Sequence, residues 1–370
     1  MVLRHNRHYE EEVSMSTITI GVDLAKSVFS VCEMDGTGHV LRRQDLKREA
    51  FALWLAQRPA GTVVAMEACS GAHHWARRCI EYGLVPKLMA AQFVAPFRKS
   101  RTIKNDRNDA EAIATAAQQG HMRFVPVKTV EQQARLACHR VREGYKVEAL
   151  AVGNRIRGLL AEFGLVVAKS DVALRRILAD LDAQRALPGE LRELLQELRA
   201  HWARLREAVD ACSARIADHA REDARCQRLG HLIGVGPITA DAAVATVTQA
   251  REFKNGRQMA AWLGLVPTQH SSGGHARLGG ISCRGDAYLR TLLIQGARSS
   301  LQRAKAVAID QATPEQRWIR ALAARLPFGK VLVAIANKHA RQIWAMLAHD
   351  VDYDPSACLA HPMHRQASTT

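Results

Sequence analysis

Short apolar runs alternate with helical stretches over residues 16–128, which is typical of an α/β domain. The first run is rich in β-forming residues and ends at an acid, Asp23. The predicted elements, in chain order, are strands at Thr17–Val22, Val28–Glu33 and His39–Leu41, a helix at Lys47–Gln57, a strand at Thr62–Met66, a helix at Ala72–Tyr82, a strand at Pro86–Ala90 and a helix at Asp109–Gln119.

Residues 129–225 carry almost no strand signal and a long apolar seam. Its members are spaced alternately by four and three residues, which is the heptad pattern of a coiled coil. They are Leu191, Leu195, Leu198, Trp202, Leu205, Val209, Cys212 and Ile216. The seam can pair with the earlier helix, around Leu136–Phe163, or with its copy in a second chain. We favour the second arrangement, a dimer.

These patterns divide the chain into three domains between two disordered ends. Residues 16–128 have the element order of a ribonuclease-H-like fold, with three strands followed by alternating helices and strands. Residues 129–225 form the helical coiled-coil region, and residues 226–350 form a mostly helical domain interrupted by the glycine-rich stretch HSSGGHARLGGISCRGD. Residues 1–15 are expected to be a disordered extension and 351–370 a disordered tail. The fold class is therefore α/β plus all-α.

The charge balance favours nucleic acid as a partner. Lys and Arg number 52 and Asp and Glu 36, a net charge of +16, and basic surfaces bind phosphates with release of counterions. A basic enzyme without a polyanionic ligand is the alternative. The chain has no apolar run long enough for a membrane span and no secretory signal. We expect a cytoplasmic protein whose eight cysteines are reduced. Because the cysteines form no C-x-x-C pair, we do not expect a structural zinc site.

Four acids stand where an α/β sheet places functional groups. Asp23 and Glu67 each end a predicted strand, and Asp106 and Asp109 lie three apart at the start of a helix, so they share one face. Carboxylates grouped in this way bind hard divalent cations such as Mg²⁺ and can support phosphoryl transfer. Each acid taken singly could instead cap a helix. Nearby bases that would bind phosphates strengthen the metal hypothesis; they are Arg98, Lys99, Arg101, Lys104 and Arg107.

Two motifs in the third domain indicate contact with nucleic acid. In LIGVGPITA, Gly234 and Gly236 would let backbone N–H groups approach a phosphate, and Pro237 would begin the second helix of a helix-hairpin-helix. A plain turn between helices is the alternative. Further on, Ser271 and Ser272 precede two glycines, and a serine hydroxyl among cations can act as a nucleophile. Ser-Gly-Gly is also an ordinary loop sequence, and Ser282 is a competing candidate for the nucleophile. The flanking cations expected to bind nucleic acid are Arg277, Arg284 and Arg290.

These motifs together resemble those of the DEDD transposases of the IS110 family of bacterial insertion sequences, which are bridge-RNA-guided recombinases. GVDLAKS, MEACSG and KNDRNDAEAIA resemble the three metal-site motifs of the family, and LIGVGPITA, FKNGRQMAAWLGLVP and the serine segment resemble its C-terminal transposase domain. The resemblance covers about residues 16–350. The chain departs from it at Cys283, where many members have Lys, so a phosphate contact there is in doubt.

The resemblance implies a RuvC-like metal-binding domain, a coiled coil, and a transposase domain whose serine bonds covalently to DNA. It implies that Asp23, Glu67, Asp106 and Asp109 hold Mg²⁺ and that Ser272 is the nucleophile. It also implies donor DNA, target DNA and a structured guide RNA as partners, and a homodimer or homotetramer that holds two DNA sites.

Three rival functions fit parts of the sequence. A metal-dependent junction nuclease would need the four acids but no serine. A nucleic-acid-binding architectural protein would need neither. An actin-like sugar or acetate kinase shares a start similar to GVDLAKS, but the chain has no further glycine-rich phosphate loops in the right place.

Overall fold

The computed structural model describes residues 18–98, 106–181, 187–272 and 275–355. The chain forms two compact units, Met1–Thr129 and Val130–Thr370. The predicted extension at 1–15 and most of the predicted tail at 351–370 lie outside the described residues. None of the described helices is both long and apolar enough to cross a membrane.

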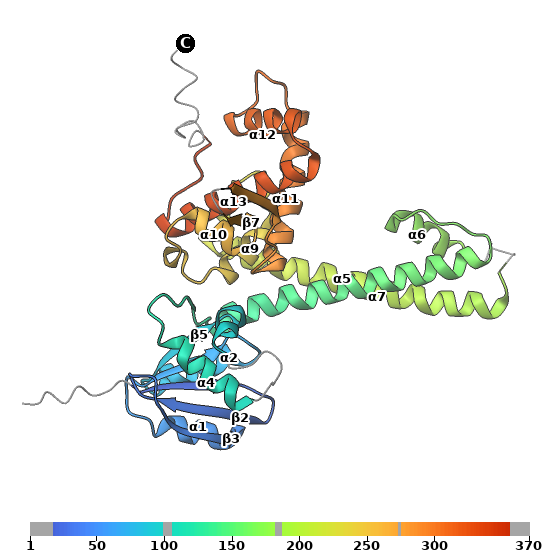
Figure 1. Cartoon of the computed structure of the whole chain (residues 1–370). Helices are drawn as coiled ribbons and strands as arrows, with labels where there is room; N and C mark the ends of the chain where they lie inside the picture. The colour runs from blue at the N-terminus through green and yellow to red at the C-terminus, as the bar shows by residue number, and fades with distance from the viewer. Residues whose placement is uncertain (1–17, 99–105, 182–186, 273–274, 356–370) are drawn as a thin grey trace, which may run out of the picture. The chain divides into compact units, whose positions relative to one another are not determined.

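A single mixed sheet organises the first unit (Figure 1). Its strand order is β3-β2-β1-β4-β5-β6; β1 pairs antiparallel with β2 and parallel with β4, and β5 continues the parallel part. The carboxyl ends of the neighbouring parallel strands β1 and β4 therefore lie side by side at the same end of the sheet. The strands are β1 (Thr19–Asp23), β2 (Val28–Met34), β3 (Val40–Lys47), β4 (Val63–Glu67), β5 (Val85–Met89) and β6 (Phe124–Val125).

Helices cover both faces of this sheet. On one face, α1 (Arg48–Ala56) and α2 (Ala72–Glu81) bury Phe51 and Trp75 against Val64 and Met66 of β4. On the other face lie α3 (Ala91–Val94), a 3₁₀ turn (Ala95–Phe97) and α4 (Asp106–Ala117), whose alanine-rich side packs on the alternate strand positions.

The predicted elements of this unit are present in the predicted order, but one strand was too short, and α3, the 3₁₀ turn and β6 were not predicted. We expected only His39–Leu41, whereas β3 runs from Val40 to Lys47. Its side chains are largely exposed and polar, because β3 is the edge of the sheet. An edge strand of this kind lacks the buried alternation from which a strand is predicted.

The second unit begins with two long antiparallel helices, which lie side by side in Figure 1. They are α5 (Val130–Glu162) and α7 (Gly189–Glu222), and the short α6 (Asp171–Ala179), which we did not predict, packs on both. All the seam residues are buried or partly buried, and Leu191–Leu205 packs against α5 and α6 of the same chain. The structure therefore shows the alternative that we did not favour, and the seam gives no support for a dimer.

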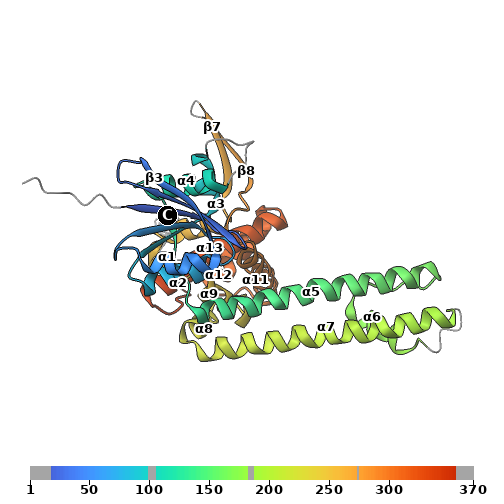
Figure 2. The same cartoon turned by 90° about the horizontal axis from the view of Figure 1, so that it is seen from below.

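The rest of this unit shares one helical core. It contains α8 (Ala224–Leu229), α9 (Pro237–Thr246), a 3₁₀ turn (Ala250–Glu252), α10 (Gly256–Trp262), α11 (Ala287–Ala306), α12 (Pro314–Arg325) and α13 (Phe328–His349). The glycine-rich stretch, which we expected only to interrupt the helices, folds as an antiparallel pair, β7 (Pro267–Ser272) and β8 (His275–Ile281). Figure 2 shows these strands standing out from the helices of the unit, and Leu278 in β8 is 66% exposed.

Candidate active site

Three of the four predicted acids converge in the first unit. Asp23 ends β1, while Asp106 and Asp109 belong to the first turn of α4. One carboxylate oxygen of each lies within 4.8 Å of the other two. Asp109 is buried and Asp106 is exposed, so the cluster opens to solvent on one side. Three carboxylates at this spacing offer the oxygen ligands that a divalent cation prefers.

A close approach of helix to strand brings these acids together. Gly21 in β1 faces α4, and a Cβ atom added there would lie 2.1 Å from the carbonyl oxygen of Ala110 and 2.6 Å from the backbone nitrogen of Ala114. Only glycine leaves room for the helix backbone at this position. The small residues on both elements therefore set the distance between Asp23 and Asp109.

Glu67 joins the site through an arginine. The residues that precede Asp23 and Glu67 are partners in the parallel β1–β4 pairing. Both acids therefore lie at the same end of the sheet. Arg98 donates to Glu67 Oε1 at 3.1 Å and pairs with Asp109 Oδ1 at 3.0 Å. Glu67 is not a member of the three-acid group among the described residues. Arg98, which we predicted as a phosphate ligand, is here the counter-ion of two acids.

The other bases of this region divide into two sets. Lys99, Arg101 and Lys104 lie outside the described residues. Arg107 pairs with Asp45 of β3, with its Nη2 2.7 Å from Oδ2. This contact is a second link between α4 and the sheet.

Sequence reasoning missed Cys69, which follows Glu67 in the MEACSG motif. The pKa of its thiol is raised, first by burial and then by the nearby carboxylates of Glu67 and Asp23. Both effects favour the neutral thiol over the thiolate, although the residue as a whole is exposed. Its position two residues after Glu67 in the motif was the available signal.

The two glycines of the predicted helix-hairpin-helix have different surroundings. Gly234 has a φ of +92°, and a Cβ there would lie 2.3 Å from the carbonyl oxygen of Gly296 in α11. Gly236 precedes Pro237 at the start of α9 and has open space around its Cα. Packing against α11 thus accounts for Gly234, while the backbone at Gly236 is accessible to a ligand.

The candidate nucleophile ends the first strand of the β7–β8 pair. Ser272 is the register partner of His275, and Ser271 is the partner of Ala276. Gly273 and Gly274 lie outside the described residues. The strands therefore bring Ser272 to the end of the pair, next to the glycines.

The predicted cations around the serine segment have different environments. Arg277 is exposed on β8. Arg290 Nη1 donates to the carbonyl oxygens of Leu263 and Arg284, at 2.9 and 3.0 Å, so this arginine holds the loop that follows β8. The competing Ser282 lies in that loop and donates its backbone N–H to Val266.

Comparison with known proteins assigns the family. A model of DEDD transposases of the IS110 type matches residues 20–164, and a model described as the transposase IS116/IS110/IS902 family matches residues 226–312. A probable family 20 transposase of Pseudomonas aeruginosa is 45% identical over 346 residues, 92% of this chain and 100% of the relative. The chain belongs to the IS110 family of transposases. The transposase for IS1111A of Coxiella burnetii is 40% identical over 92% of this chain and 92% of its own length, and that for IS1328 of Yersinia enterocolitica is 36% identical over 88% and 96%.

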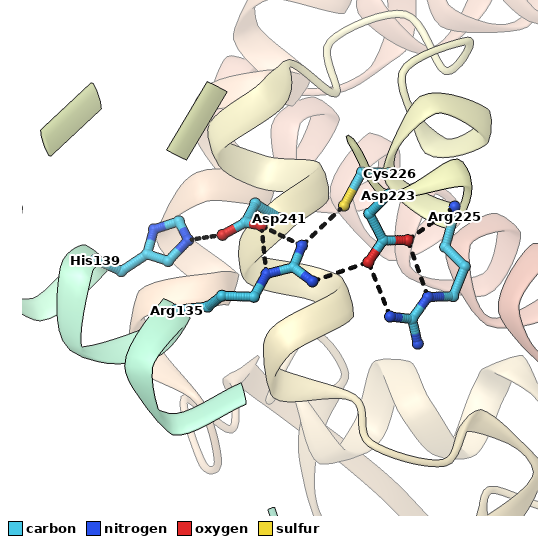
Figure 3. A network of polar contacts seen from close by, with 6 residues as sticks. All are labelled: Arg135, His139, Asp223, Arg225, Cys226 and Asp241. Atoms are coloured by element: carbon cyan, nitrogen blue, oxygen red, sulfur yellow. Dashed lines mark hydrogen bonds and ion pairs between the residues drawn. The ribbon is translucent and has the colours of Figure 1, made fainter. Parts of the chain in front are cut away.

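A buried polar network, also missed from the sequence, anchors the transposase's long helix α5 to its C-terminal helices (Figure 3). Arg135 of α5 pairs with Asp241 of α9 and with Asp223, the N-cap of α8. His139 Nε2 lies 2.8 Å from the same Asp241, and its Nδ1 lies 2.9 Å from the Tyr288 hydroxyl of α11.

Asp241 is the centre of this network and is 0% exposed. Burial alone would raise its pKa, but contacts from His139 and Arg135 hold the pKa below its ordinary value. Burial raises the pKa of Tyr288 to about 12. The network fixes α5 relative to α8, α9 and α11, the elements around the turn that contains Gly234 and Gly236.

Proposed function

We propose that this transposase cuts and rejoins DNA strands with a Mg²⁺ site built on Asp23, Glu67, Asp106 and Asp109 and with Ser272 as nucleophile, guided by a structured bridge RNA. The three-aspartate cluster is the observation that carries the proposal, because its oxygens lie within 4.8 Å of one another. The scaffold supports it: the strand order of the sheet agrees with a RuvC-like, ribonuclease-H-type domain.

The acids fit a small divalent cation. Asp23, Asp106 and Asp109 supply carboxylate oxygens, and Mg²⁺ is bound in proteins by such hard ligands. When bound, the metal would stabilise the charge that develops on a phosphate during strand cleavage. Arg98 would hold Glu67 and Asp109 in place and balance their negative charge.

In the proposed reaction the Ser272 hydroxyl oxygen attacks a DNA phosphorus. The hydroxyl gives up its proton, a phosphoserine bond forms as one P–O bond of the DNA breaks, and the leaving oxygen takes up a proton, so that the step balances. Because one phosphodiester replaces another, the reverse attack by a DNA hydroxyl rejoins a strand without a further energy source. The position of Ser272 at the end of a protruding strand pair supports this role, and the exposed Arg277 would bind the phosphate.

Guide RNA and assembly belong to the same proposal. The net charge of +16 suits binding of both RNA and DNA, and the accessible backbone at Gly236 suits contact with a phosphate. The acids and Ser272 belong to different compact units. We propose that assembly of a homodimer or homotetramer on DNA brings the two together, through a surface other than the occupied α7 seam.

The acid site is tested by DNA cleavage with the full-length protein, co-purified with its RNA. Asp106→Asn should lower the cleavage rate by at least about 100-fold, since a displaced or missing ligand disturbs the reacting geometry. Asp35→Asn, in a turn away from the cluster, should cleave as the unmodified protein does. EDTA should stop cleavage and added Mg²⁺ restore it. Equal activity of Asp106→Asn would contradict the proposal, and metal-dependent cleavage without a covalent adduct would favour a junction nuclease.

A further inference from the structure

A pocket between α10 and α13 presents two arginines without acidic partners. It has a volume of about 380 Å³ and is lined by Asn255, Gly256, Arg257, Arg341, Trp344 and Ala345. Neither Arg257 nor Arg341 has an ion pair or a side-chain hydrogen bond with any residue that the structure describes. Arg257 is exposed and Arg341 is half-buried. Most other half-buried arginines of this unit, unlike Arg341, pair with carboxylates or carbonyl oxygens, as Arg135 and Arg290 do.

Close packing of two helices fixes the position of Arg341 in the pocket. A Cβ atom on Gly256 would lie 2.9 Å from Cα and 3.0 Å from Cβ of Arg341, so α10 and α13 touch at this point. The Nε of Arg341 is buried and has no hydrogen-bond partner among the described residues. An unsatisfied buried donor on a charged group costs free energy, which a bound anion would recover.

The two arginines also repel each other. Burial, and then the positive charge of Arg257, lower the pKa of Arg341 below its ordinary value. Two like charges brought together at one pocket are unfavourable. A phosphate would satisfy both, because guanidinium groups donate to it in a forked geometry.

The third element of the pocket is an aromatic wall. The indole Nε1 of Trp344 donates to the carbonyl oxygens of Ala250 and Phe253, at 3.0 and 3.2 Å, so the ring is fixed in orientation. Such a ring can stack on a nucleic-acid base. The volume is at the small end of ligand pockets, which span about 300–1,000 Å³, and suits one nucleotide better than a duplex.

We propose that this pocket binds one unpaired nucleotide of a single-stranded segment, with its phosphate on Arg257 and Arg341 and its base against Trp344. The inference rests on the proposed function, in which the protein handles both RNA and opened DNA strands. It adds a site in the C-terminal helices whose lining includes neither the acids nor Ser272.

The test measures binding of labelled single-stranded RNA and DNA of one sequence, and of duplex DNA, to the full-length protein at several salt concentrations. Arg257→Gln combined with Arg341→Gln should weaken single-strand binding by about tenfold and reduce the slope of log K against log salt by about 0.7, the value for one phosphate. Arg325→Gln removes an exposed arginine at the end of α12 and should change the affinity less than twofold. Loss confined to RNA identifies the guide as the ligand, and loss confined to DNA identifies a transposon strand.

Stability and cross-linking give two independent readouts. Arg257→Gln alone should leave the melting temperature of the ligand-free protein unchanged or raised, because it relieves repulsion. An oligonucleotide carrying 5-iodouracil should cross-link under ultraviolet light to the peptide that contains Trp344. The proposed nucleotide site alone would be overturned if its variants lost no more affinity for single-stranded nucleic acid than Arg325→Gln. It would also be overturned if they lost binding of a polyglutamate peptide, an anion without bases, instead of binding of nucleic acid. An unmodified protein that binds no nucleic acid would overturn the proposed function as well.

Discussion

A single methyl group on β1 should disable the proposed metal site. In Gly21→Ala the new Cβ would lie 2.1 Å from the carbonyl oxygen of Ala110. Ordinary contact begins at 3.4 Å, so α4 must move away from β1 by about 1.3 Å. The neighbouring atoms are backbone, which cannot rotate out of the way. Asp106 and Asp109 move with the helix, whereas Asp23 stays on the strand.

This shift exceeds what a metal site tolerates. Metal–oxygen distances in proteins hold to within about 0.2 Å, and a displacement of about 1 Å at reacting groups costs roughly 100-fold in rate. We expect Gly21→Ala to lower the Mg²⁺ affinity at least about tenfold and cleavage about 100-fold. The overpacking should also lower the free energy of unfolding by about 1–3 kcal/mol.

Calorimetric titration with Mg²⁺, together with circular dichroism and DNA cleavage, measures these effects. Gly36→Ala is the matched control, since a Cβ there meets nothing within 4 Å, and it should bind metal normally. A folded Gly21→Ala protein with unchanged Mg²⁺ affinity would refute the argument that the helix–strand approach sets the site.

Two further predictions concern stability. Arg135→Met should lower the free energy of unfolding by about 3–5 kcal/mol in urea, since it strips a buried charge at Asp241 of its cation; the surface variant Arg221→Met should cost less than about 1 kcal/mol, and equal losses would contradict the network's role. Burial, against an opposing effect of Glu315, lowers the pKa of His339 from 6.5 to about 4, so the unfolded chain alone binds a proton between these values. Stability should therefore fall by up to about 3 kcal/mol as pH drops from 6.5 to 4, and His339→Leu should show a smaller loss over that range; identical pH profiles would contradict this.

The sequence predicted the three-aspartate cluster and the neighbouring Glu67 because all four acids follow simple positional rules. Asp23 and Glu67 end strands that proved to be parallel neighbours, and Asp106 and Asp109 share a helix face. The pairing of Arg98 with two of these acids was not predictable, because it depends on how the chain after β5 turns back to the strand edge. From the sequence, Arg98 had seemed free to bind a phosphate.

Elements with weak apolar patterns were missed or misplaced. The β7–β8 pair is polar and interrupted by glycine, and the residues of both strands whose burial is described form no buried face that would reveal it. The heptad seam of α7 was predicted residue by residue, but such a seam does not say whether its partner is in the same chain. The Arg135–Asp241 network joins residues 106 positions apart, and no local pattern marks contacts at that distance.

Trapping the covalent intermediate tests the central claim most directly. The full-length protein with its RNA is incubated with a nicked DNA substrate that prevents rejoining, and the products are separated under denaturing conditions. The unmodified protein should give a protein–DNA adduct, and nuclease digestion followed by mass spectrometry should place the phosphate on Ser272. Ser272→Ala should give no adduct, while Ser271→Ala, its neighbour on β7, should retain one. An adduct that persists in Ser272→Ala, or that disappears only in Ser282→Ala, would contradict the assignment of the nucleophile.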